Sequence, residues 1–129
     1  MEKVFIVEDD SLMIRMYEKI FKLSNYSVEM AFDGEEALAK IQAMSRKPNI
    51  ILLDVMMPKL SGFDVLKKLK EMPDFKDIPV VLLTNLSGKE DAERGISLGA
   101  VDYLVKSDYE PKQVIEKIKN ILLESAKKL

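Results

Sequence analysis

The chain has 129 residues, of which 47% are hydrophobic and 33% charged, and its 20 Lys and Arg residues nearly balance its 22 Asp and Glu residues. This composition is typical of one globular domain, which excludes a disordered chain, and the scattered basic residues argue against direct nucleic-acid binding. The sequence contains neither Cys nor His, which excludes disulfides, thiolate chemistry and histidine ligands. Any metal ion must therefore bind to oxygen ligands, and these favour Mg²⁺, Ca²⁺ or Mn²⁺.

The sequence carries no sign of a membrane segment. No apolar run approaches the roughly 18 residues that a membrane-spanning helix needs. The N-terminus passes directly from an apolar run into acidic residues, which is not the layout of a signal peptide. We therefore expect a cytoplasmic protein without membrane insertion.

The first part of the chain alternates strand patterns with helix patterns. Residues 4–7 form an apolar run typical of a strand, and residues 28–31 alternate as a less buried strand would. Between them an apolar stripe recurs at helical spacing. The stripe consists of Leu12, Met13, Met16, Tyr17, Ile20 and Leu23. A second helical pattern, over residues 37–44, follows Asp33 and Gly34.

The middle of the chain repeats this alternation. The wholly apolar run 50–53 indicates a strand that is covered on both faces. Ser61 can cap a third helix, whose apolar residues extend from 65 to 72. A fourth strand is predicted over residues 78–83, with Pro79 tolerated near its start.

The remainder adds a weak helix, a fifth strand and a strong helix. Residues 87–98 make a poor helix because Gly88 and Gly95 lower its propensity and its apolar stripe is thin. Residues 101–105 form the fifth strand. The last helix opens at Pro111. Its apolar face consists of Val114, Ile115, Ile118, Ile121 and Leu122.

Five strand–helix units predict an α/β fold, a doubly wound (βα)₅ sheet of five parallel strands with helices on both faces. The expected strand order is 2-1-3-4-5, the flavodoxin-like arrangement. No linker or internal repeat interrupts the pattern, so we expect residues 1–129 to form a single domain with no output domain.

Chemistry-bearing residues follow the ends of four predicted strands. They are Glu8, Asp9 and Asp10 after the first strand, Asp54 after the third, Thr84 after the fourth and Lys106 after the fifth. In a sheet of this order, a crevice lies beyond the carboxyl ends of strands 1 and 3. Each residue alone has an ordinary structural explanation, a helix cap for Asp10 above all, but their convergence at one rim predicts a site.

Carboxylates gathered in one crevice repel one another, so they must share protons or bind a hard cation. Mg²⁺ prefers oxygen ligands and leaves positions open for a phosphate. Lys106 and the Thr84 hydroxyl could neutralise a transferring phosphoryl group, and Asp54 would be the nucleophile. The sequence has no Gly-rich phosphate loop, so a bound nucleotide is not expected.

The chain resembles the receiver domains of two-component response regulators, including the stand-alone chemotaxis type. The similar stretches are VFIVED at 4–9, IILLDVMMP at 50–58 with Gly62 following, VVLLT at 80–84 and GAVDYLVK at 99–106. The resemblance spans essentially the whole chain, and the order and spacing of its five elements are more specific than any one motif.

The resemblance implies that Asp54 is the phospho-acceptor. It also implies a magnesium site, for which Mn²⁺ can substitute. The implied ligands are Asp9, Asp54, the backbone carbonyl of Met56, and Glu8 through a water molecule, with Asp10 as a further possible ligand. Thr84 would move onto the bound phosphoryl group, Lys106 would pair with it, and Tyr103 would be the switch aromatic.

Two residues depart from the family pattern. Ser107 follows Lys106 where the family usually has Pro, so the Lys106–Ser107 peptide is either trans or held cis by the fold. Asn85 follows Thr84 where a small residue is commoner, and its side chain would either crowd the entrance or contact the phosphoryl group.

The expected function is that of a phosphorylation-activated signalling switch, not an enzyme beyond its own phosphoryl transfer and slow dephosphorylation. The implied partners are a sensor histidine kinase or histidine-phosphotransfer protein, and a protein target or second phosphotransfer protein. A phosphorelay intermediate and a pseudo-receiver that works without phosphorylation remain alternatives. A phosphatase with an Asp nucleophile would need a second Asp where the chain has Met56, which argues against that enzyme class.

Overall fold

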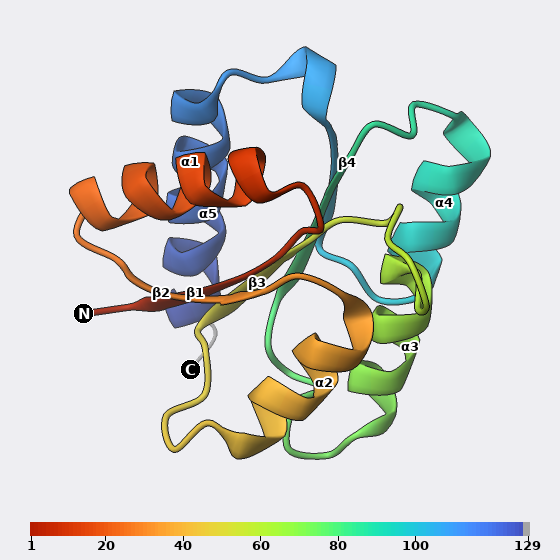
Figure 1. Ribbon diagram of the computed structural model, residues 1–129, viewed down its shortest axis with the longest axis horizontal. Helices are drawn as coiled ribbons and strands as arrows, with labels where there is room; N and C mark the ends of the chain where they lie inside the picture. The colour runs from red at the N-terminus through yellow and green to blue at the C-terminus, as the bar shows by residue number, and fades with distance from the viewer. Residues whose placement is uncertain (128–129) are drawn as a thin grey trace.

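The computed structural model describes residues 1–127 and shows one five-stranded sheet between two layers of helices (Figure 1). The strands are β1 (Lys3–Val7), β2 (Ser27–Ala31), β3 (Ile50–Leu53), β4 (Val80–Thr84) and β5 (Asp102–Val105). The helices are α1 (Ser11–Leu23), α2 (Gly34–Ala43), α3 (Gly62–Glu71), α4 (Lys89–Ser97) and α5 (Pro111–Lys127), with a 3₁₀ turn at Lys106–Asp108. All strand pairs are parallel and their order is β2-β1-β3-β4-β5. The predicted fold and strand order are confirmed.

Alternate residues of the central strands face two separate cores, as the pleat of a strand requires. Phe5 and Leu53 pack beneath α2 and α3, whereas Ile6 and Leu52 pack beneath α1 and α5. Because both faces are covered, β1, β3 and β4 are buried along their whole length. This explains why their sequences are continuous apolar runs rather than alternating ones.

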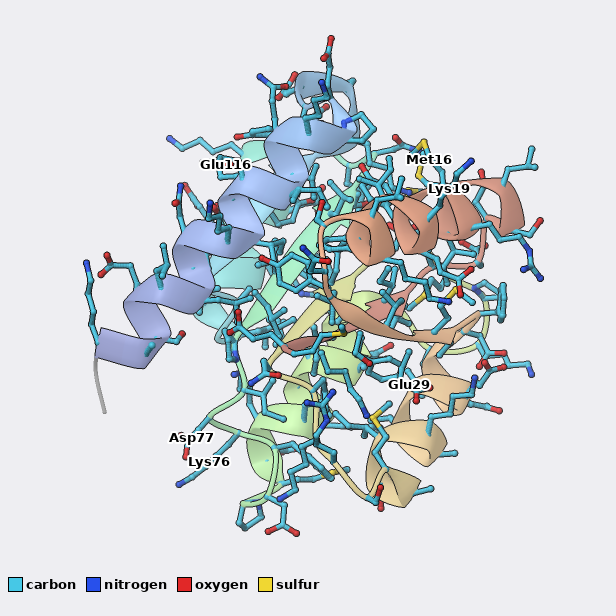
Figure 2. The ribbon with its side chains drawn as sticks, turned by 90° about the vertical axis from the view of Figure 1, so that its left-hand side faces the viewer. Met16, Lys19, Glu29, Lys76, Asp77 and Glu116 are labelled. Atoms are coloured by element: carbon cyan, nitrogen blue, oxygen red, sulfur yellow. The ribbon has the colours of Figure 1, made fainter. Side chains whose placement is uncertain are left out.

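The helical face predicted for α1 is partly wrong. The residues of α1 that are buried are Ile14, Tyr17 and Phe21, while Leu12 and Leu23 are 84% and 75% exposed. Figure 2 shows Met16, also exposed, on the side of α1 that is turned away from the sheet. The apolar residues of α1 form two overlapping stripes, both at helical spacing, and the period alone does not tell which stripe faces the sheet.

Strand 4 begins and ends later than predicted, because Val80 opens it and Thr84 closes it. Ile78 and Pro79 belong to the preceding turn, in which the Lys70 ammonium group donates to the carbonyl oxygen of Ile78 at 3.1 Å. Strand 5 likewise begins one residue after the predicted start, at Asp102. Thr84 is therefore a strand residue and completely buried.

Helix α4 is as weakly anchored as its sequence suggests, since Gly95 is its only buried residue. Gly95 is also a close-packing position. A Cβ atom there would lie 2.6 Å from the Leu82 side chain and 3.1 Å from the Tyr103 ring. The glycine that lowers helix propensity thus lets α4 approach β4 and β5.

The turn after β3 is held by Gly62 and by the cap of α3. Ser61 and Asp64 form a reciprocal capping box, as the predicted Ser61 cap required. The Gly62 amide donates to the Val55 carbonyl at 2.8 Å. A Cβ atom on Gly62 would lie only 2.1 Å from the carbonyl oxygen of Asp54.

Replacing Gly62 with Ala should therefore displace the backbone of Asp54 and destabilise the fold. We expect Gly62→Ala to lower the free energy of unfolding by about 2 kcal/mol or more, because a backbone atom cannot rotate away from the clash. Urea denaturation measures the change. Gly88→Ser is the matched control, since it places a hydroxyl at the uncapped N-terminus of α4. This variant should not lower the free energy of unfolding. Equal stabilities of the two variants would contradict the prediction.

Candidate functional site

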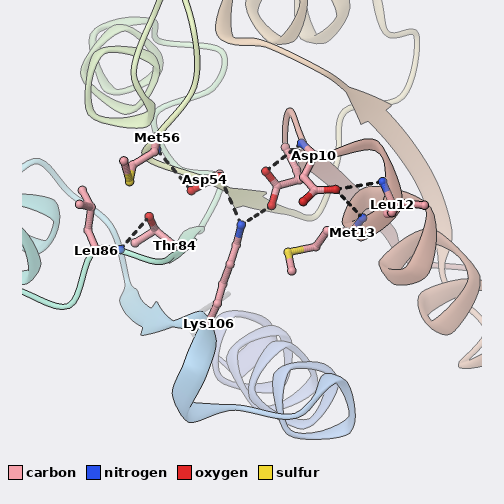
Figure 3. A network of polar contacts seen from close by, with 9 residues as sticks. Asp10, Leu12, Met13, Asp54, Met56, Thr84, Leu86 and Lys106 are labelled. Carbon is pink, nitrogen blue, oxygen red and sulfur yellow. Dashed lines mark hydrogen bonds and ion pairs between the residues drawn. The ribbon is translucent and has the colours of Figure 1, made fainter.

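The carboxyl ends of four strands bring the predicted site residues to one edge of the sheet. Because the strands are parallel and in register, the residues that follow β1, β3 and β5 emerge at the same edge. Glu8, Asp54 and Lys106 come directly after these strands, and Thr84 is the last residue of β4. Figure 3 shows Lys106 extending from the end of β5 toward Asp54.

A buried cluster of charges lies at this edge. The Lys106 ammonium group donates to Oε1 of Glu8 and, at 3.3 Å, to Oδ2 of Asp54. The three side chains are only 6–9% exposed. A buried carboxylate costs several kcal/mol of desolvation when it has no partner, so each carboxylate depends on the lysine, and the lysine depends on them.

Three carboxylates converge closely enough to hold a cation. Oxygen atoms of Glu8, Asp9 and Asp54 all lie within 4.8 Å of one another. Opposite oxygen ligands of an octahedral Mg²⁺ are about 4.2 Å apart, so this set fits one magnesium ion. Asp9 is exposed, and it therefore lies on the solvent side of the cluster, where an ion could enter. The cluster therefore supplies the oxygen ligands that a magnesium site requires.

Asp10 serves as the N-cap of α1. Its Oδ1 accepts from the amides of Leu12 at 3.0 Å and Met13 at 3.2 Å. The Asp10 amide in turn donates to Oε2 of Glu8 at 3.3 Å, which fixes the Glu8 carboxylate from below the cluster. Of the two roles that the sequence left open for Asp10, the structure displays the cap.

The pKa of Glu8 is raised to about 7, mainly because the carboxyl group is buried and also because Asp54 lies beside it. Lys106 opposes this shift but does not cancel it. The pKa of Lys106 is itself raised, because its hydrogen bond to Glu8 and the charge of Asp54 outweigh the effect of its burial. Without a cation the Glu8 carboxyl group thus keeps its proton to a higher pH than a free carboxyl group would.

Thr84 and Tyr103 are connected through one residue of the loop after β4. The hydroxyl oxygen of Thr84 accepts from the amide of Leu86 at 3.3 Å, and the Tyr103 hydroxyl donates to the Leu86 carbonyl at 2.8 Å. The Asp54 side chain is similarly tied to its own loop, since Oδ1 accepts from the Met56 amide at 3.3 Å. Loop backbone therefore links the end of β4 to the Tyr103 side chain.

Of the two departures from the family pattern, the structure settles the first, and the contact of Asn85 with a phosphoryl group stays a prediction. The Lys106–Ser107 peptide is trans, and Ser107 lies inside the short 3₁₀ turn. Asn85 is exposed, so it does not fill the pocket. Sequence analysis missed Tyr17, whose buried ring borders a cavity of about 10 Å³ beneath Glu8 and Asp54. Its helical spacing marked it as apolar core, and nothing local in the sequence placed it next to the charges.

Within residues 1–127, no helix is both long and apolar enough to cross a membrane.

Comparisons with known proteins agree on one family. Residues 4–119 match the model of the response regulator receiver domain. The chain is 37% identical over 121 residues to a probable transcriptional regulator, ycf27, of Porphyridium aerugineum, covering 94% of this chain and 48% of that protein. The chain thus spans about half the length of this curated relative.

Solved structures show the same likeness. A CheY-like response regulator receiver domain protein from Methanospirillum hungatei superposes with a TM-score of 0.91 at 27% identity, covering 100% of this chain and 99% of that one. The phosphorylated cyanobacterial phytochrome response regulator RcpA gives a TM-score of 0.79 at 32% identity, covering 93% and 90%.

The raised pKa of Glu8 predicts how the metal-free protein responds to pH. Between about pH 4.5, where an unfolded Glu titrates, and about pH 7, the folded state keeps a proton that the unfolded chain has lost. Stability should therefore fall as pH rises through this window, by on the order of 2 kcal/mol. Denaturation in the presence of a chelator measures this. Glu8→Gln should remove this contribution, whereas the exposed-site control Glu2→Gln should keep it. Parallel pH profiles for wild type and Glu8→Gln would refute the assignment.

Proposed function

Since the chain belongs to the response regulator receiver domain family of two-component systems, we propose that it is a phosphorylation-driven switch whose phosphoryl group is carried by Asp54. The observation that supports this most directly is the position of the Asp54 carboxylate. One of its oxygens faces the Lys106 ammonium group, and the carboxylate belongs to the trio that can hold a cation. A nucleophile, a positive charge and a metal site thus meet at one point.

In the proposed reaction, an oxygen of Asp54 attacks the phosphorus atom of a phosphohistidine on a partner protein. The bond between phosphorus and the histidine nitrogen breaks, and the nitrogen keeps the electron pair. Lys106 then pairs with the phosphoryl oxygens, which replaces part of its contact with Asp54. The donor in this scheme is a sensor histidine kinase or a histidine-phosphotransfer protein.

Asp9, Asp54 and the carbonyl oxygen of Met56 would hold Mg²⁺ directly, with Glu8 acting through water. Bound there, the ion would offset the negative charge of the phosphoryl oxygens. Glu8 and Asp9 thus select a hard cation, and Asp54 serves both as ligand and as nucleophile. Asp10 stays outside this set because its carboxylate is engaged at the N-terminus of α1.

Phosphorylation would be transmitted through Thr84. Its hydroxyl oxygen accepts from the Leu86 amide, and donating to a phosphoryl oxygen would require the hydroxyl to turn toward Asp54. The Leu86 backbone would then be free to move, and it carries the Tyr103 contact and leads into α4. Moving a two-state population from 1:99 to 99:1 takes about 5.5 kcal/mol, and several charge-assisted hydrogen bonds supply energies of this size. The surface around β5, α4 and α5 would present the change to a partner.

The first test is phosphorylation by a small donor. Acetyl phosphate should add one phosphoryl group only when Mg²⁺ or Mn²⁺ is present, because the carboxylates repel phosphate without a cation. Intact-mass spectrometry measures the product. Asp54→Asn should stay unmodified, while Asp74→Asn, at an exposed position, should react like wild type. Full modification of Asp54→Asn would rule out the assigned acceptor.

Lys106→Met should uncouple phosphorylation from the switch surface. The variant keeps an apolar stem but loses the charge that would hold the phosphoryl group, so Mg²⁺ should still bind while NMR shifts across residues 87–103 no longer respond to phosphorylation. Lys112→Met, at an exposed site in α5, is the control. If both variants show the wild-type response, Lys106 has no role in the coupling.

The phosphorylated state should decay slowly. Water must be oriented in line with the phosphorus atom before it can attack, and the residues two positions after Asp54 and Thr84 are the apolar Met56 and Leu86. Met56→Asn and Leu86→Glu should each accelerate the loss of the phosphoryl group, as followed by mass spectrometry. Unchanged decay in both variants, or several-fold slower decay in Asn85→Ala, would show that another group controls the water.

A further inference from the structure

A groove of about 540 Å³ opens beside the acidic cluster, between the loop after β3 and helix α4. Its lining includes Asp9 of the acidic cluster, the apolar side chains of Met56, Phe63 and Leu86, and Arg94 of α4. The groove is shallow and open to solvent. The proposed phosphoryl chemistry uses Asp9, Met56 and Leu86 of this lining, whereas Phe63 and Arg94 have no role in it.

Arg94 is held in this groove by an aromatic ring. The central carbon of its guanidinium group lies 4.5 Å from the centroid of the Phe63 ring. Phe63 is buried and fixed by α3, so it forms a rigid platform. Stacking uses a face of the guanidinium group and leaves the N–H donors along its edge available.

Those donors have no protein partner in the described part of the chain. Neither an ion pair nor a side-chain hydrogen bond involves Arg94 among residues 1–127. Asp91, one turn earlier, also lines the groove. Its Oδ2, however, points back toward Gly88, because it lies 3.1 Å from the position that a Cβ atom on Gly88 would occupy. Its charge therefore faces the N-terminus of α4, where the helix dipole favours it, and the exposed Arg94 is free to bind a ligand.

We propose that this groove is an accessory subsite for the non-transferred part of a small acyl-phosphate donor, which would act in place of a protein donor, and that Arg94 binds a carboxylate carried there. The proposal rests on the phosphoryl-accepting function of Asp54. The occupant is an apolar group that bears the transferable phosphoryl at one end and a carboxylate at the other. This arrangement matches the lining of the groove, which combines the cation-binding carboxylate of Asp9, apolar side chains and the guanidinium group of Arg94.

The reaction balances with an acyl phosphate as donor. An Asp54 oxygen bonds to phosphorus, the bond from phosphorus to the acyl oxygen breaks, and the donor leaves as a carboxylate with that electron pair. Arg94 touches neither the phosphorus nor the leaving oxygen. It contributes only to binding, which makes it a specificity-determining residue that discriminates between donors.

The test compares benzoyl phosphate with 4-carboxybenzoyl phosphate, which differ only in the distal carboxylate. Phosphorylation rates are measured by intact-mass spectrometry at fixed ionic strength and saturating Mg²⁺, in wild type and Arg94→Gln. For each protein, the rate with 4-carboxybenzoyl phosphate is divided by the rate with benzoyl phosphate. This ratio should be about threefold or more higher in wild type than in Arg94→Gln, the factor expected of an exposed ion pair. Arg94→Lys should keep part of the preference, and Arg15→Gln, at an exposed site on α1, should keep all of it.

An arginine that only covers Phe63 would affect stability, or both rates equally, but not their ratio. Equal ratios in wild type and Arg94→Gln would therefore overturn the subsite. Acetyl phosphate separates this failure from that of the proposed function. If acetyl phosphate phosphorylates Asp54 while the ratios are equal, the subsite alone is wrong, whereas no phosphorylation by any of the three donors would overturn both.

Discussion

The buried ion cluster of Lys106, Glu8 and Asp54 is the constraint on which the site depends. Removing Lys106 would leave two carboxylates buried without compensation, which costs far more than an exposed ion pair gains. The cluster also joins the ends of three strands that are distant in sequence. The charges of the cluster do not balance, because two buried carboxylates share one lysine. Burial, together with the neighbouring Asp54, raises the pKa of Glu8, and the excess of negative charge is what a cation would satisfy.

The parallel sheet makes this cluster possible. In-register parallel strands deliver their following residues to one edge, and the two apolar cores hold the strands at fixed spacing. Local geometry then completes the placement. Gly62 admits the Asp54 carbonyl at a distance that no Cβ atom allows, and Asp10 caps α1 while its amide orients Glu8. The stable part of the fold thus presents charges in a fixed arrangement.

The loop after β4 and helix α4 differ from this rigid frame. Thr84 is buried in a strand, but the Leu86 backbone that it contacts is held by two side-chain hydrogen bonds and little else. Helix α4 buries a single glycine, so few apolar contacts oppose its movement. A change of charge at Asp54 would therefore act on a weakly held segment next to a strongly held one, which suits a switch.

The sequence by itself determined the number, order and type of the elements, because short apolar runs and helical stripes alternate with few exceptions. It also determined that acidic residues, a hydroxyl and a lysine follow strand ends, and parallel pairing implies that these meet. Element ends were less certain. The start of β4 depends on a turn that Lys70 holds from another helix, and the buried face of α1 depends on which of two stripes meets the sheet.

Only the tertiary structure decided the contacts between distant residues. The pairing of Lys106 with Glu8 joins residues 98 positions apart, and the closeness of Tyr17 to the charges, the stacking of Arg94 on Phe63 and the packing of Gly95 against Tyr103 also have no local signal. Periodicity reports which residues are apolar and how they repeat along one element. Which side chains of different elements touch is set by the packing of those elements against one another.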